Sequence, residues 1–213
     1  MAEPGIKGSV FAGIIEQVRI LRASGRVAQR ELEARLGKEG LAYLDEKIMA
    51  AKWYSIRVYG AIRELLRDVE GGGREEYTIQ AGAESARRLI ASGLYQQLDF
   101  LKRWRDQLHT RDREIERQRR SHFSRQLSLV STIHRSLFNF GDLKIEQVPG
   151  FTDRFQLEYW DQGTMPRVCR LAVLGFWNEL SRSWSARGRA DLFNKVDADD
   201  HYMLVMTRDV ADV

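Results

Sequence analysis

The chain has 213 residues, with 34 basic and 30 acidic side chains, so its net charge is +4 and its isoelectric point is about 9.3. A single cysteine, Cys169, excludes a disulfide framework or a cysteine-based zinc site within one chain. No stretch approaches the roughly 18 uninterrupted apolar residues of a membrane span, and no signal peptide opens the sequence. We therefore expect a cytoplasmic protein that does not associate with membranes.

Apolar residues at spacings of three and four predict helices through the first 140 residues. We expect a first helix beginning near Val10 and closed by Ser24-Gly25, two short helices over 27–37 and 41–48, and longer helices over 56–69 and 77–92. A further helix is expected over 94–104. The triple glycine at 71–73 is the strongest turn. It follows a helix and no Lys-Ser or Lys-Thr comes after it, so we interpret it as a loop and not a phosphate cradle.

A long helix is predicted from Thr110 to Phe138, since this stretch contains neither Gly nor Pro. Its second half carries an apolar stripe, and its first half is almost entirely charged. The stripe consists of Phe123, Leu127, Val130, Ile133 or His134, and Leu137. A helix that is apolar at one end and polar at the other typically connects two subdomains or lies along a partner.

Positive charge is concentrated just before and within that helix. Residues 102–125 contain nine basic and four acidic side chains, a local net charge of +5 against +4 for the whole chain. A solvated helix face, a phosphate-binding surface, an acidic protein partner and the same helix of a second subunit all agree with this pattern. The candidate partner-binding residues are Arg113, Arg117, Arg119 and Arg120.

Beyond Phe140-Gly141-Asp142 the apolar period changes to two, which predicts strands over 143–148 and 155–160. A broadly apolar helix follows from Pro166 to Gly188, and two more strands are expected over 190–196 and 202–207. The predicted fold is α+β: an N-terminal helical bundle followed by a small antiparallel sheet packed on a long helix. We divide the chain into a helical domain (1–109), a connecting helix (110–140) and a β-β-α-β-β domain (141–213).

The last third of the chain resembles a known superfamily. The segments FQLEYWDQ, PRVCRLAVLGFWNELSRSW and YMLVMTRD are similar to the ligand-binding α+β fold shared by vinyl-reductase-type, haem-NO-binding and TRAPP-like proteins and by several bacterial regulator families. The resemblance implies a dimerising or sensory module and not an enzyme. Haem-binding members carry Tyr-x-Ser-x-Arg, whereas this chain has Tyr54-Ser55-Ile56-Arg57, and metal-binding members use several Cys and His. Neither haem nor metal is therefore carried over, and we expect no cofactor.

Several residues could act as nucleophiles or metal ligands, but each has a simpler structural interpretation. Cys169 has Arg167, Arg170 and a helix start beside it, which would lower the pKa of its thiol, but a buried structural cysteine is favoured. His134 lies on the apolar side of the long helix, where a histidine satisfied within the core is expected. The acidic run 197–200 lacks the Gly and closing Glu of a calcium loop. No HExxH, GxSxG, GxGxxG or Walker motif is present, so no catalytic residue is predicted.

Aromatic residues define the candidate ligand pocket, placed between the helical part and the sheet. Its proposed members are Trp53, Tyr54, Trp160, Cys169 and Trp177. We expect a non-enzymatic regulatory or interaction protein, a homodimer that binds another protein or an apolar or anionic small molecule. The alternative is a nucleic-acid-binding protein that uses the arginine-rich segment 102–125.

Overall fold

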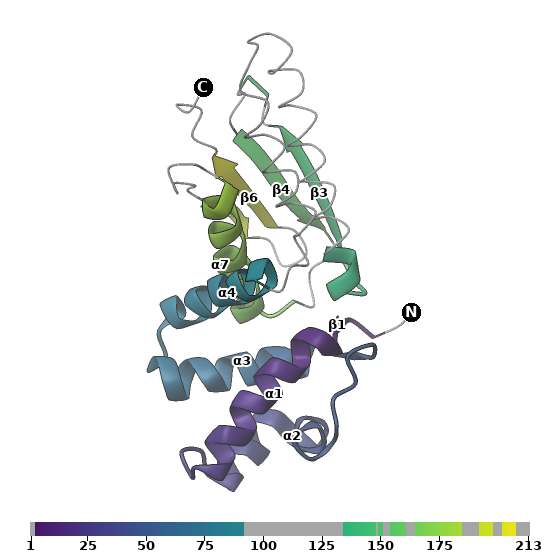
Figure 1. Ribbon diagram of the computed structural model, residues 1–213, viewed down its shortest axis with the longest axis vertical. Coiled ribbons are helices and arrows are strands. Elements are labelled where there is room, and N and C mark those ends of the chain that lie inside the picture. Colours follow the sequence, from purple (N-terminus) through teal and green to yellow (C-terminus); the bar gives the residue numbers. More distant parts are fainter. Residues whose placement is uncertain are drawn as a thin grey trace.

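The computed structural model describes residues 3–91, 134–147, 149–150, 154–160, 165–184, 192–197 and 202–207. Four helices form the N-terminal part, with α3 in contact with α1, α2 and α4 (Figure 1). Their bounds are α1 (Gly8–Ala23), α2 (Gln29–Asp45), α3 (Ile56–Gly71) and α4 (Glu75–Ala91). Gly72 and Gly73 have positive φ angles of 60° and 78°, so the predicted turn after α3 is confirmed.

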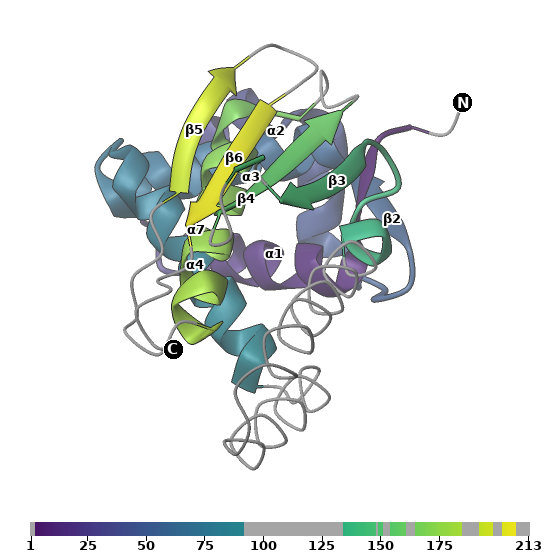
Figure 2. The same ribbon diagram turned by 90° about the horizontal axis from the view of Figure 1, so that it is seen from above.

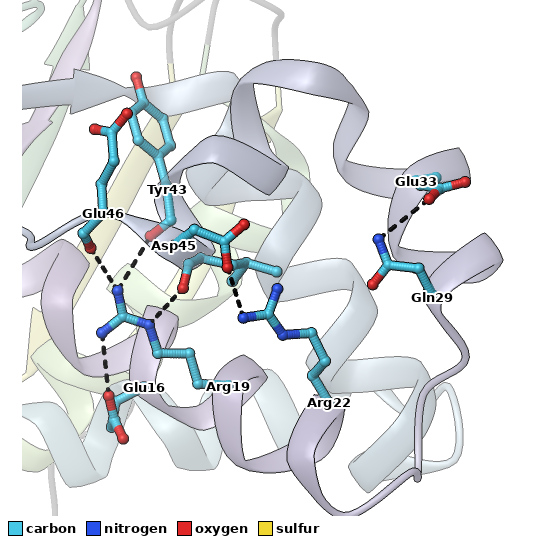
Figure 3. Close-up of polar contacts among 9 residues, drawn as sticks. Glu16, Arg19, Arg22, Gln29, Glu33, Tyr43, Asp45 and Glu46 are labelled. Atoms are coloured by element: carbon cyan, nitrogen blue, oxygen red, sulfur yellow. Dashed lines mark hydrogen bonds and ion pairs between the residues drawn. The ribbon is translucent and has the colours of Figure 1, made fainter.

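The span of α2 consists of two helical segments that meet at a kink at Gly37, so the predicted break between two short helices is confirmed. Gly37 has a φ of 62° inside α2, and glycine adopts this conformation without steric cost. The end of α2 is held by Arg19 of α1, whose guanidinium donates to the carbonyl oxygens of Leu44, Tyr43 and Glu46 (Figure 3). These carbonyls have no partner within their own helix, and Arg19 satisfies them.

A two-stranded sheet interrupts the helical part, which is therefore not all-helical as predicted. Strand β1 (Gly5–Lys7) pairs antiparallel with β2 (Trp53–Ser55). A bridge between Ile6 and Phe138 attaches β1 to the segment that leads into the carboxy-terminal sheet. The Gly5 amide also donates to the Asn139 side-chain oxygen, and the Asn139 backbone amide donates to the Gly5 carbonyl oxygen. The amino-terminal strand thus binds the end of the helical turn at 134–137.

The carboxy-terminal part is a β-β-α-β-β unit, as predicted. Strands β3 (Asp142–Gln147), β4 (Arg154–Trp160), β5 (Leu192–Asp197) and β6 (Tyr202–Thr207) form an antiparallel sheet in the order β3-β4-β6-β5 (Figure 2). Helix α7 (Arg167–Trp184) lies against one face of this sheet (Figure 1). The α+β fold class is confirmed.

Helices α4 and α7 approach each other closely through two glycines. A Cβ added at Gly82 would lie 1.9 Å from the Ala172 carbonyl oxygen, and one at Gly175 would lie 1.8 Å from the Ile79 carbonyl oxygen. Each glycine thus admits the backbone of the opposite helix. This contact joins the helical part to the helix that covers the sheet.

Buried residues from both parts form one continuous hydrophobic core that runs from Ile6 to Leu180. The predicted boundary at residue 109 lies outside the described residues, and the three-part division stays a prediction. Within the described residues, no helix combines the length and the apolar surface that crossing a membrane requires.

Candidate functional site

The predicted pocket residues of β2 have separate environments. Trp53 is 41% exposed, and the Lys7 ammonium lies 4.1 Å from the centroid of its ring, a cation–π contact at the surface. Tyr54 is buried and stacks on Phe11 at 4.8 Å between ring centroids, and its hydroxyl accepts a hydrogen bond from the Met49 amide. Tyr54 therefore belongs to the core under α1.

The remaining pocket candidates lie on α7 and β4. Cys169 is buried on the side of α7 that meets α3, and burial raises the pKa of its thiol to about 12. The expectation that neighbouring arginines lower this pKa is therefore wrong, because desolvation of the thiolate outweighs the positive charge of Arg63. Trp177 is buried toward the sheet, and Trp160 ends β4, where only its backbone is described.

The predicted partner-binding site is not among the described residues. The arginine-rich segment, with Arg113, Arg117, Arg119 and Arg120, lies outside the described residues. Within the described ranges, no group of three or more His, Cys, Asp or Glu side chains is arranged to hold a metal ion.

His134 is buried without the hydrogen bonds that a buried histidine normally forms. It is 6% exposed, and neither Nδ1 nor Nε2 has a hydrogen-bond partner among the described residues. The prediction of a buried histidine is correct, but the expected satisfied hydrogen bonding is absent there. An unpartnered buried polar group of this kind destabilises the fold unless something else supplies a partner.

Aromatic rings surround His134. The Phe138 ring lies 5.0 Å away between centroids, and the Tyr159 ring meets His134 edge-on at 5.5 Å. Trp177 of α7 donates its Nε1 hydrogen to the Tyr159 hydroxyl, which connects this aromatic group to the helix under the sheet. We call His134, Phe138, Tyr159 and Trp177 the His134 cluster.

The charge state of His134 follows from its burial. Desolvation lowers the pKa of its imidazole to about 4, which Arg135 reinforces and Asp142 opposes. The ring is therefore neutral at pH 7 and carries one donor nitrogen and one acceptor nitrogen. A neutral imidazole among aromatic rings suits an apolar ligand that has a single hydrogen-bonding group.

A second buried polar side chain, Arg63, was not predicted from the sequence. Arg63 of α3 is 8% exposed, and its Nε and Nη2 donate to the Tyr59 hydroxyl at 3.0 and 2.6 Å. A signal was present: Arg63 follows Tyr59 by four residues and precedes Leu66 by three, so it occupies the apolar stripe of the helix.

The chain's nearest equivalent of the haem-binding motif, at residues 54–57, binds the amino-terminal segment. Ser55 and Arg57 both donate to the Glu3 carboxylate, at 3.2 and 3.3 Å, while Tyr54 is engaged with Phe11 and Met49. Arg57 thus forms a solvent-exposed ion pair with Glu3.

Comparisons with known proteins identify no family, and they find a distant structural likeness. No protein family and no curated protein matches the sequence. A solved structure of an H-NOX protein from S. oneidensis in the Fe(II) ligation state is similar over 95% of both chains, with 13% sequence identity and a TM-score of 0.49. Nothing about this chain's ligand or function follows from a likeness at that identity and score.

Proposed function

We propose that the protein is a non-enzymatic regulatory module that binds a small apolar molecule at the His134 cluster. The observation that supports it is the pair of buried, unpartnered ring nitrogens on His134. Such a group lowers stability, and natural proteins keep destabilising arrangements chiefly where function needs them. A ligand with one hydrogen-bonding group and an apolar body would satisfy a ring nitrogen and bury its own surface against Phe138 and Tyr159.

The His134 cluster includes residues from three structural elements, so binding there could alter how these elements pack. His134 and Phe138 belong to the segment that β1 holds, Tyr159 belongs to the sheet, and Trp177 belongs to α7. A ligand in contact with all three elements would change how firmly they pack together. A regulatory role needs this kind of differential stabilisation of one arrangement over another.

Native mass spectrometry of freshly purified protein tests the proposal. The wild-type chain should carry extra mass that denaturation releases, and His134→Phe should lose it while remaining folded. Thr78→Val is the matched control, because the Thr78 hydroxyl on α4 is the other buried group without a partner in the described structure. Wild-type protein with the mass of the polypeptide alone, or equal retention in His134→Phe, would contradict the proposal.

The same spectra report the oligomeric state. The homodimer remains a proposal, because the apolar stripe from Phe123 to Leu137 lies outside the described residues except at His134 and Leu137. The proposal predicts twice the chain mass at micromolar concentration.

A further inference from the structure

Phe138 is the member of the His134 cluster that lies nearest to solvent. Tyr159 and Trp177 are 1% and 2% exposed, whereas Phe138 is only partly buried. The Phe138 ring lies 5.0 Å from the His134 ring between centroids, so it covers the imidazole on its outer side. Among the described residues, the shortest route from solvent to His134 therefore passes Phe138.

The other two rings cannot move aside without disrupting larger elements. Strand β4, which carries Tyr159, is paired with β3 on one side and with β6 on the other. Trp177 lies within α7, which packs closely against α4. Phe138 instead follows the short helical turn at 134–137, and its amide donates to the His134 carbonyl oxygen at 2.9 Å. Displacing Phe138 thus disturbs the smallest part of the fold.

The amino-terminal strand β1 holds Phe138 in place. Ile6 forms a β-bridge with Phe138, and the Gly5 amide donates to Oδ1 of Asn139 at 2.6 Å. The Asn139 amide donates to the Gly5 carbonyl oxygen at 3.2 Å, and its Nδ2 group donates to the Glu3 carbonyl oxygen at 3.1 Å. Because Asn139 is exposed, water competes for these hydrogen bonds, and contacts of this kind open locally while the rest of a fold stays closed.

We propose, on the basis of the ligand site proposed above, that β1 is a strap that keeps the Phe138 ring over His134 and that Asn139 fastens this strap. When the contacts between β1 and residues 138–139 open, Phe138 moves aside and a molecule reaches the ring nitrogens of His134. When these contacts form again, Phe138 closes over the bound molecule. Asn139 is a positioning residue, because it acts on the site only through β1 and Phe138.

Chemical modification of the full chain by diethyl pyrocarbonate tests the strap without any ligand. The reagent acylates neutral imidazole rings that it can reach, and peptide mass spectrometry assigns the product to His134 among the four histidines of the chain. We expect His134 to react far more slowly in the folded wild type than in the urea-unfolded chain. Asn139→Ala should raise the folded-state rate about tenfold, because it removes two hydrogen bonds that oppose local opening. Phe138→Ala removes the covering ring and should raise the rate at least as much.

Arg19→Ala is the control for a general loss of stability, since the hydrogen bonds of Arg19 go to the end of α2 and to Glu16. This variant should leave the rate at His134 unchanged. An unchanged rate in Asn139→Ala or in Phe138→Ala would overturn the proposal. An equal rise in Arg19→Ala would also overturn it, because the reagent would then enter through opening of the whole fold. No ligand enters these measurements, so the strap can fail while the native mass spectra support the ligand site, and the strap can hold while those spectra show no ligand.

Discussion

Trp177 on α7 donates a hydrogen bond to the hydroxyl of Tyr159 on β4, and the Tyr159 ring meets His134 edge-on. One buried contact thereby connects the helix under the sheet, the sheet itself and the segment that precedes it. The unpartnered His134 ring lies against Phe138 of its own segment and against Tyr159, which Trp177 holds in turn.

The contact between Trp177 and Tyr159 should be energetically coupled. We expect Trp177→Phe and Tyr159→Phe each to lower the free energy of unfolding, and their double mutant to show a coupling energy of about 0.5–1.5 kcal/mol. Urea unfolding of the four proteins measures this. Fully additive effects would show that the hydrogen bond contributes nothing measurable.

Stability should fall in mildly acidic solution because of His134. The folded-state pKa is about 4, below the roughly 6.5 of an unfolded chain, so the unfolded state takes up the proton first. The contribution of His134 is complete above pH 6.5 and is lost as the pH falls towards 4, by about 3 kcal/mol at most. Urea unfolding of wild type and His134→Phe between pH 7.5 and 4.5 measures the difference, which other titrating groups do not affect. Parallel pH profiles for the two proteins would contradict the burial of a neutral imidazole.

The close approach of α4 and α7 should not tolerate a side chain. Gly82→Ala places a methyl group against the Ala172 carbonyl oxygen, so we expect the free energy of unfolding to fall by about 3 kcal/mol. Gly13→Ala is the matched control, because Gly13 is also helical but its added Cβ meets nothing within 4 Å. That variant should gain about 0.5–1 kcal/mol from the better helix propensity of alanine. Equal effects of the two substitutions would show that the helices can separate without cost.

Two neighbouring arginines of α1 should differ in importance (Figure 3). Arg19→Ala leaves the terminal carbonyl oxygens of α2 without their donor, and we expect a loss of about 1–2 kcal/mol in thermal or urea unfolding. Arg22→Ala removes only an ion pair with the exposed Asp45, worth no more than about 0.5 kcal/mol. A larger loss in Arg22→Ala than in Arg19→Ala would contradict this assignment.

The alternative function makes a separate prediction. If the arginine-rich segment binds DNA or RNA, affinity should fall steeply between about 50 and 200 mM salt, and the triple substitution of Arg117, Arg119 and Arg120 by Glu should abolish binding. Fluorescence anisotropy with labelled duplex and single-stranded oligonucleotides measures both effects. Binding that survives the triple substitution would exclude this segment as the nucleic-acid interface.

Most of the fold is encoded locally and was predictable. The helical period of α3, the triple glycine after it and the alternation in β3 and β4 each act over a few residues, so their patterns identify these elements. The small β1–β2 sheet was missed because its strands have only three residues each and lie far apart in the chain. Its formation depends on tertiary pairing, and no short pattern reports that.

The candidate sites were harder to predict for a physical reason. A charged residue within an apolar stripe, such as Arg63, is normally assigned to the surface, and its burial depends on tertiary packing that a local pattern does not report. His134 was recognised as a core residue. Its lack of hydrogen-bond partners depends on the positions of Phe138 and Tyr159, which come from different elements.

The most direct test of the proposed ligand site is an electron-density map from crystals of freshly purified protein. We predict density for a small non-protein molecule within hydrogen-bonding distance of a ring nitrogen of His134, with its apolar part against Phe138 and Tyr159. A ring whose nitrogens are bonded only to an ordered water or to another part of the chain would contradict the ligand site.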